Sequence, residues 1–302
     1  MLLIIIMYAL LAGSFSMGKI LLNHTSPIFL TGIRMFIAGI ILLTYQYFSP
    51  REHFKFSTKH LALYAQIIFF GFYLTYILRF WGLRDMASYK AVFLYNISPF
   101  STALYSYLML NERITKKQII GLCIGFVGLI PILLTTSKAE QLTGELFFIS
   151  WQEWAIIVSV FASSYSWILI RKMIHHKNYA PAMINGLCMT AGGTLALITA
   201  CFIPGSLYIT EPITFAGWLI AVIVISNIIG HNMYGHLLKI YTATFISFAG
   251  FLSPLFAAFY GWAFLGETIT WNFYISSIIL FIGLYVFYQD ELKNRNLNLL
   301  VE

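Results

Sequence analysis

Ten apolar stretches of membrane-spanning length constrain this chain more than any other feature. Each holds about 18 to 25 residues, enough for an α-helix to cross the hydrocarbon core of a bilayer. Hydrophobic residues make up 60% of the 302 residues and charged residues only 10%, which leaves little chain for a soluble domain. We therefore predict an all-α integral membrane protein with ten transmembrane helices, at residues 2–22, 27–48, 61–82, 87–109, 116–135, 151–171, 182–203, 214–237, 242–264 and 271–289.

An internal repeat divides these spans into two sets of five. Residues 93–129 align without a gap with residues 248–284, at an offset of 155, and 14 of the 37 aligned positions are identical. The identities include two Ser-Pro pairs, Ser98-Pro99 and Ser253-Pro254. This duplication predicts three parts of the chain: a five-helix repeat at 1–138, a second at 150–290 and a short cytoplasmic tail at 291–302.

The placement of cations predicts the orientation in the membrane. Lys and Arg are disfavoured in loops that cross to the outside. With the amino terminus in the cytoplasm, the inner loops and the tail hold twelve of the 18 Lys and Arg residues. We therefore predict a multi-pass protein of a bacterial cytoplasmic (inner) membrane with both termini in the cytoplasm.

An odd number of spans in each repeat predicts that the two repeats are inverted. Cations support this: Glu112 is followed by Arg-Ile-Thr-Lys-Lys, whereas the equivalent Glu267 is followed by Thr-Ile-Thr-Trp-Asn. Inverted-topology repeats are common in secondary transporters, in which one half rocks against the other around a site near the midplane. The pattern therefore favours alternating-access transport.

The repeated segment, with its Pro-bearing span, acidic turn and Gly-rich span, resembles the EamA-type drug/metabolite transporter family. The resemblance extends over nearly the whole chain through Gly13-Ser14-Phe15, Lys19, Pro27, Arg34, Gly82-Leu83-Arg84, Ser98-Pro99, Leu110 to Thr115, Gly121, Gly125, Gly128, Ser253-Pro254, Gly266 to Thr270 and Gly283. It implies a ten-helix carrier whose central cavity is formed mainly by spans 1, 3, 4, 6, 8 and 9. It does not specify a substrate, because the family moves amino acids, purines, sugars, cationic drugs and S-adenosylmethionine-like metabolites.

Besides the cations at the cytoplasmic ends of the predicted spans, four lie at membrane depth, where each costs about 2.5–3.5 kcal/mol on insertion scales. They are Lys19, Arg34, Arg79 and Lys90, all in the outer halves of their spans. One interpretation is an electropositive vestibule that binds a carboxylate or phosphate. The other is that the side chains extend to the headgroups or pair internally with outer carboxylates, namely Glu153, Glu211 and Glu267.

Polar and aromatic residues on the predicted cavity helices suggest a pocket for a planar or amphipathic metabolite. The predicted substrate-binding residues are Tyr73, Tyr76, Arg79, Lys90, Tyr95, Asn96, Trp167, His231 and Asn232. Plain helix packing is the alternative for the aromatic members. His231 is either a site of proton coupling or a hydrogen bond between helices. Since no Asp or Glu lies in the middle of a span, exchange and facilitated diffusion also stay open.

Pro99 and Pro254 lie within predicted spans, where a proline removes a backbone hydrogen bond and favours a kink. They are either gating hinges or static bends. Gly121, Gly125 and Gly128 form a small-residue face that predicts close helix packing. Glu112 and Glu267 are expected to act as caps or ion-pair partners.

A secondary transporter is the function that these features favour. An integral membrane enzyme is disfavoured because no catalytic motif is found, and a channel because no span carries a filter signature; a receptor role stays open. The predicted substrate is an amino acid or another carboxylate-bearing metabolite, with S-adenosylmethionine or a nucleotide-like compound as the alternative. We expect no cofactor, no metal and no nucleic acid, and a monomer or homodimer in the lipid bilayer.

Overall fold

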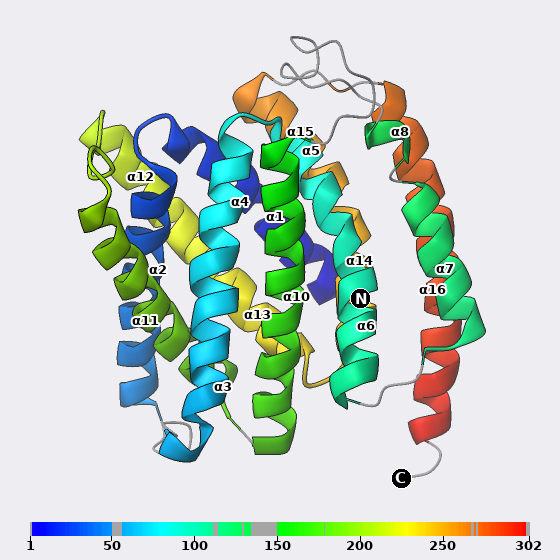
Figure 1. Ribbon diagram of the computed structural model, residues 1–302. Coiled ribbons are helices and arrows are strands. Elements are labelled where there is room, and N and C mark those ends of the chain that lie inside the picture. The colour runs from blue at the N-terminus through cyan, green and yellow to red at the C-terminus, as the bar shows by residue number, and fades with distance from the viewer. Residues whose placement is uncertain are drawn as a thin grey trace.

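The computed structural model describes residues 2–49, 56–110, 114–128, 130–133, 150–177, 179–266, 269 and 271–299. Within these residues the regular structure is entirely helical, in a bundle of long helices (Figure 1). The first half contains α1 (Leu2–Leu22), α2 (Pro27–Phe48), η2 (Thr58–His60), α3 (Leu61–Gln66), η3 (Ile67–Leu74), α4 (Thr75–Arg84), α5 (Ser88–Leu94), η4 (Tyr95–Ile97), α6 (Ser98–Leu110), α7 (Lys116–Val127) and α8 (Ile130–Leu133).

The second half repeats this order of elements. It contains α10 (Trp151–Lys177), α11 (Pro181–Phe202), α12 (Pro212–Val222), η5 (Ile223–Gly230), α13 (His231–Leu237), α14 (Ala243–Ala249), η6 (Gly250–Leu252), α15 (Ser253–Leu265) and α16 (Trp271–Leu299). The described residues of each predicted span lie mostly in a helix or a run of helices.

Seven helical runs in the described part of the chain are long and apolar enough to cross a membrane. The predicted spans 87–109, 116–135 and 271–289 are not among them. Residues 88–110 are helical throughout, but Ser, Asn, Tyr and Pro side chains lower their mean hydropathy. The apolar helix Trp271–Phe287 is shorter than the others. The structure thus shows an all-α membrane protein, while the number ten stays a prediction.

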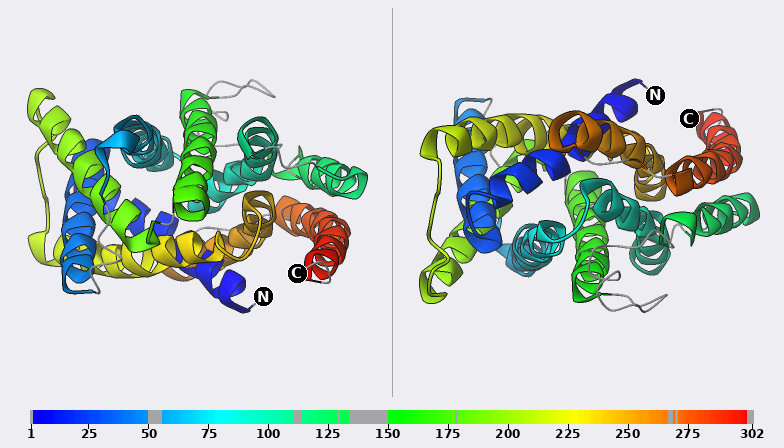
Figure 2. Two further views of the ribbon diagram at one scale, coloured as in Figure 1. Left: turned by 90° about the horizontal axis from the view of Figure 1, so that it is seen from below. Right: turned by 90° about the horizontal axis from the view of Figure 1, so that it is seen from above.

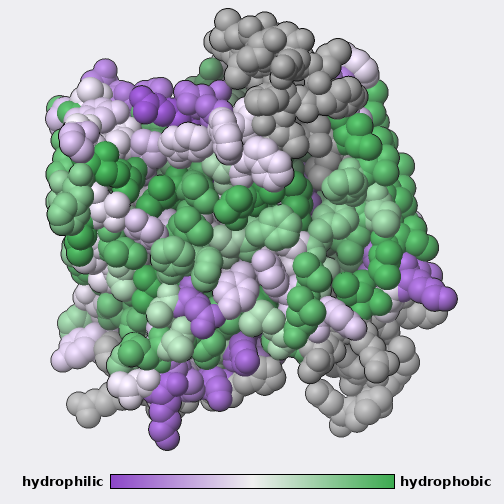
Figure 3. All heavy atoms as spheres, in the orientation of Figure 1, coloured by the Kyte–Doolittle hydropathy of each residue, from purple (hydrophilic) through white to green (hydrophobic). Residues whose placement is uncertain are grey.

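The molecular surface is that of a protein immersed in lipid. Figure 3 shows hydrophobic residues across the middle of one face and hydrophilic residues gathered near its two ends. Large apolar side chains on several helices are exposed, among them Leu108 at 63% and Trp262 at 61%. In water such a surface would aggregate, so it requires a bilayer around it.

Corresponding elements of the two halves run in opposite directions. In Figure 1, α3 to α4 rises through the bundle whereas α12 to α13 descends, and α5 to α6 descends whereas α14 to α15 rises. Figure 2 shows the pairs α2/α11 and α7/α16 at opposite ends of the bundle. The remaining long helices lie between these pairs and surround the centre.

The predicted proline kinks are helix breaks. A 3₁₀ turn separates α5 from α6 and another separates α14 from α15, at positions 155 residues apart. Pro99 and Pro254 are the second residues of α6 and α15. A first-turn proline loses no intrahelical hydrogen bond, so these residues favour the start of a new helix over a bend in a continuous one. Their role as hinges stays a prediction, and Glu112 and Glu267 lie outside the described residues.

Glycines bring the outer helix pairs into close contact. In the α7/α16 pair, a Cβ on Gly121 would lie 2.9 Å from the carbonyl oxygen of Gly283, as the predicted small-residue face requires. In the α2/α11 pair, a Cβ on Gly193 would lie 2.4 Å from the backbone nitrogen of Phe36. The obstructing atom belongs to the backbone, so it cannot rotate away.

Replacing Gly193 by Ala is therefore expected to destabilise the protein by about 2 kcal/mol, the usual range for overpacking. Gly217, in α12, is the matched control because a Cβ there meets no atom within 4 Å, and Ala is the better helix former. Thermal unfolding in detergent should show a lower midpoint for Gly193→Ala and no decrease for Gly217→Ala. Equal midpoints for the two variants would contradict this packing.

Candidate substrate-binding cavity

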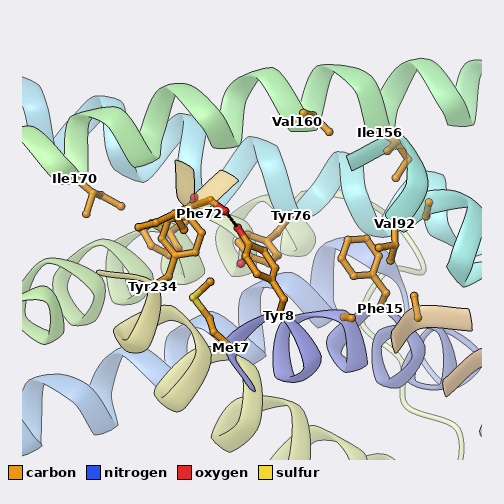
Figure 4. Close-up of a cluster of buried hydrophobic side chains, with 14 of the residues drawn as sticks. Met7, Tyr8, Phe15, Phe72, Tyr76, Val92, Ile156, Val160, Ile170 and Tyr234 are labelled. Atoms are coloured by element: carbon orange, nitrogen blue, oxygen red, sulfur yellow. Dashed lines mark hydrogen bonds between the residues drawn. The ribbon is translucent and has the colours of Figure 1, made fainter. Parts of the chain in front are cut away.

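A cavity lies at the centre of the bundle, lined by residues of α1, η3/α4, α5/η4/α6, α10, α13 and α14/η6/α15. These elements correspond to spans 1, 3, 4, 6, 8 and 9, the set that the family resemblance implies. Figure 4 shows several of the lining side chains, with Phe15 and Val92 toward one end and Phe72 and Tyr234 toward the other.

The two halves contribute equivalent positions to this cavity. Of its 22 lining residues, 18 form nine pairs separated by 155, the offset of the sequence repeat. The pairs are Tyr8/Ser163, Leu11/Ser166, Ala12/Trp167, Phe15/Ile170, Tyr76/His231, Arg79/Tyr234, Val92/Ser247, Tyr95/Gly250 and Ser98/Ser253. Only the last pair is chemically identical. The cavity is therefore built from matching backbone positions but has unequal chemistry on its two sides.

Six of the nine predicted substrate-binding residues line the cavity: Tyr76, Arg79, Tyr95, Asn96, Trp167 and His231. The other three lie elsewhere. Tyr73 forms a 3.0 Å hydrogen bond with the hydroxyl of Thr199, and Asn232 accepts one of 3.1 Å from the amide of Asn185.

Helix geometry explains why Tyr73 and Asn232 were misplaced. On a regular α-helix Tyr73 would share a face with Tyr76, because they are three residues apart. However, Tyr73 lies in the π-helical segment η3, whose wider turn changes which residues share a face. Phe72 lines the cavity instead. Asn232 follows His231 directly, and adjacent residues on an α-helix point in different directions.

Lys90 is buried in an ion pair rather than placed in the cavity. Its Nζ lies 2.8 Å from Oε1 of Glu153, and both side chains are about 95% buried. The other carboxylate oxygen of Glu153 accepts hydrogen bonds from the backbone nitrogen and the hydroxyl of Ser150. Lys90 thus connects α5 to the capped start of α10, as the internal-pairing interpretation anticipated.

The other predicted intramembrane cations also have specific partners. The Nζ of Lys19 donates to the backbone carbonyl of Met86 at 2.6 Å. The Nε of Arg34 donates to Asn227 at 2.8 Å and its Nη2 to Ser226 at 3.2 Å. Neither cation lines the cavity. Of the four, Arg79 is the one that does.

Arg79 is surrounded by aromatic rings. Its Nε donates to the hydroxyl of Tyr95 at 2.7 Å. Its guanidinium carbon lies 4.4 Å from the ring centroid of Tyr95, 4.6 Å from that of Tyr76 and 5.0 Å from that of Phe15. Such cation–π contacts stabilise a buried charge. Among the described residues no carboxylate pairs with Arg79, so the guanidinium retains donors for an anionic ligand.

His231 connects the two halves. Its Nδ1 lies 2.7 Å from the carbonyl oxygen of Ser226, so this nitrogen carries the hydrogen and donates it. Nε2 is then an acceptor, and it receives the hydroxyl of Tyr76. Tyr76 and His231 are equivalent positions of the repeat. The helix-bridging interpretation describes this contact, whereas proton coupling stays a prediction.

The end of the cavity that contains Phe72 and Tyr234 is aromatic. The rings of Trp167 and Tyr234 are 4.1 Å apart at 30°, and His231 lies 5.8 Å from Trp167. The hydroxyl groups of Tyr8 and Tyr234 share a hydrogen bond (Figure 4). Four of the aromatic lining residues were not predicted from the sequence: Tyr8, Phe15, Phe72 and Tyr234. The repeat offset could have found Tyr234, the counterpart of Arg79, but apolar packing and pocket lining look alike in sequence.

Comparison with known proteins identifies the fold that holds this cavity. The model of the EamA-like transporter family matches residues 1–134 and 150–289. The chain belongs to the EamA-like transporter family. The match covers both halves of the cavity, so the paired positions described above are features of an EamA-like transporter.

Several relatives of this EamA-like transporter are transporters of small metabolites. It is 33% identical over 287 residues to an S-adenosylmethionine/S-adenosylhomocysteine transporter of Chlamydia muridarum, covering 93% of this chain and 89% of the relative. It is 30% identical to one of Chlamydia trachomatis serovar D, covering 93% and 86%. A probable amino-acid metabolite efflux pump of Salmonella typhimurium is 21% identical, with coverages of 94% and 92%. Together these relatives support a small-metabolite transporter.

A solved structure shows the same fold. It is described only as "Crystal structure of protein", and it superposes with a TM-score of 0.72 over 97% of this chain and 96% of its own. The sequence identity is 13%.

The Lys90 ion pair can be tested by substitution. Lys90→Met leaves the Glu153 carboxylate buried without its partner, which costs about 3–5 kcal/mol. We expect a much lower unfolding midpoint for Lys90→Met, and recovery of most of the loss in Lys90→Met combined with Glu153→Gln. A well-folded Lys90→Met protein that has lost ligand binding would instead assign Lys90 to the substrate.

Proposed function

We propose that this transporter carries S-adenosylmethionine and S-adenosylhomocysteine across the cytoplasmic membrane. One observation carries the proposal: a single cavity contains both Arg79, which has no described carboxylate partner, and an aromatic wall formed by Trp167 and Tyr234. The relatives named for these two metabolites, at 30–33% identity over 93% of the chain, support the same choice.

The chemistry of the two ends suits the two ends of this ligand. A guanidinium binds a carboxylate through charge-assisted, often bidentate hydrogen bonds, so Arg79 would hold the amino-acid end. Trp167 and Tyr234 would stack on the adenine base, an interaction worth about 1–3 kcal/mol per base in other proteins. The rings of Tyr76 and His231 lie between these ends. Aromatic faces there also favour the sulfonium cation of S-adenosylmethionine.

This choice replaces an amino acid as the favoured substrate. A free amino acid would use Arg79 but leave the aromatic wall without a partner. The relative named for amino-acid metabolites is 21% identical to this chain, and this identity is well below that of the S-adenosylmethionine transporters. The substrate that the sequence offered as the alternative is therefore the better supported one.

Alternating access is the proposed mechanism. Repeats 1–138 and 150–290 would rock against each other around the cavity, as inverted repeats do in other transporters. The Tyr76–His231 contact lies at equivalent positions of the two halves, where such a motion changes distances least. Pro99 and Pro254 would act as hinges at the helix breaks. The protein would be a carrier and not an enzyme, with both termini in the cytoplasm of a bacterial cell.

Flux measurements test this function. Purified protein in proteoliposomes should take up labelled S-adenosylmethionine with saturation, and unlabelled S-adenosylhomocysteine should compete. Methionine should compete weakly because it cannot reach the aromatic wall. Absence of saturable S-adenosylmethionine flux, with saturable flux of an amino acid in the same vesicles, would refute the proposal.

Arg79 should discriminate between ligands with and without a carboxylate. Arg79→Gln is expected to weaken S-adenosylmethionine binding at least about tenfold, since hydrogen bonds to charged groups contribute about 1.5–3 kcal/mol. Binding of 5′-methylthioadenosine, which lacks the carboxylate, should change little. Arg84→Gln is the control, because Arg84 is exposed at the end of the same helix. Equal losses for both ligands would show that Arg79 only maintains the cavity.

A further inference from the structure

We propose that Asn96 and Ser166 bind the base of the ligand and make the transporter selective for adenine; this rests on the proposed function. Both side chains line the central cavity and are 2% exposed. The Nδ2 of Asn96 and the Oγ of Ser166 have no hydrogen-bond partner among the described residues. An unpaired buried polar group costs about 1–3 kcal/mol, so a ligand that supplies the partner would recover this free energy.

Most other polar side chains of the cavity already have partners in the protein. The hydroxyl of Tyr95 bonds to Arg79 and to Ser159, and that of Tyr76 bonds to His231. Ser14 donates to the carbonyl oxygen of Leu11. Asn96 and Ser166 are thus the cavity residues whose fully buried polar atoms are left for a neutral, planar group of the ligand.

Asn96 is placed at a break in the repeat symmetry. It lies in η4, where the 3₁₀ turn interrupts the span. The equivalent residue of the second half is Phe251, which does not line the cavity. The Phe251 ring instead packs 4.5 Å from Phe248 and fills the space beside Gly125. One half thus uses this position for apolar packing, while the other places an unpaired amide there.

Ser166 is placed beside the aromatic wall. It directly precedes Trp167 on α10, and its Oγ fills the space that Gly71 leaves, since a Cβ on Gly71 would lie 2.1 Å from it. Its repeat counterpart is Leu11, which also lines the cavity. The hydroxyl therefore adds a donor and an acceptor to one side of the pocket only.

The chemistry of these groups selects the base as their partner. Arg79 is assigned to the carboxylate, and the ammonium group beside it cannot accept a hydrogen bond from Nδ2 of Asn96, which leaves the oxygens of the ribose and the nitrogens of the base. The edge of adenine presents a ring-nitrogen acceptor next to the N6 donor, and the Asn amide is the side chain that complements this pattern. Inosine reverses it, because its 6-oxo group is an acceptor and N1 carries a hydrogen. The proposed selectivity is thus adenine over hypoxanthine.

Binding to the purified full-length protein tests the proposal, with S-adenosylmethionine, adenosine and inosine as probes. Wild-type protein should bind adenosine at least tenfold more tightly than inosine. Asn96→Leu should remove this preference and weaken S-adenosylmethionine binding at least tenfold. Because Asn96 Nδ2 has no described partner, this nearly isosteric change should not lower the unfolding midpoint. If Asn96→Leu does not fold, Asn96→Ser serves as the second variant with the same expected loss of preference.

Matched serine variants separate a ligand contact from a general effect of buried hydroxyls. Ser166→Ala should weaken adenosine binding severalfold. Ser106→Ala and Ser276→Ala should not, although these hydroxyls are equally buried and also have no described partner, because they lie outside the cavity. If the Asn96→Leu variant binds S-adenosylmethionine as tightly as the wild type and still prefers adenosine to inosine, this inference is overturned, but the proposed function is not. Failure of the wild type to bind S-adenosylmethionine would overturn the proposed function as well.

Discussion

The arrangement of this protein depends on one geometric constraint: two copies of one helical pattern enclose a single cavity. The copies run in opposite directions (Figure 1), and equivalent positions of both line the same cavity. Nine pairs at the repeat offset line the cavity, and one of them, Tyr76 and His231, is in direct contact. In both halves the helix that follows the break begins at an equivalent residue, Ser98 in the first half and Ser253 in the second. The two halves thus contribute equally to the shape of the cavity.

The side chains at equivalent positions differ in chemistry between the halves, and this difference makes the two ends of the cavity unlike. The repeat counterpart of Arg79 is a tyrosine, that of Trp167 an alanine and that of Ser166 a leucine. A charge at membrane depth is costly, and here aromatic rings rather than a described carboxylate accompany it. A ligand with an anionic end and a planar end fits such a cavity in one orientation. In the proposed mechanism the symmetric scaffold provides the movement, and its asymmetric side chains provide the recognition.

The sequence predicted the helices well, because apolar length and the repeat determine them directly, whereas the set of cavity-forming spans was implied by the family resemblance. Six of the nine predicted binding residues line the cavity, since helical spacing identifies a face once the helix is regular; their contact with a substrate stays a prediction. Tyr73 was misplaced because a local π-helix cannot be read from apolar periodicity. Lys90 was misplaced because its partner Glu153 lies 63 positions away, and sequence alone cannot distinguish a buried ion pair from an anion site. The unpaired state of Asn96 likewise depends on every neighbour in three dimensions.

The most direct measurement is the accessibility of one equivalent pair from the two sides of the membrane. Ser98→Cys and Ser253→Cys, each in a protein whose three native cysteines are replaced, would be exposed to a membrane-impermeant thiol reagent in vesicles of either orientation. Alternating access at a shared cavity predicts that both positions react from both sides and that S-adenosylmethionine slows both reactions over the same concentration range. Reaction of each position from one side only, with no protection by the ligand, would contradict it.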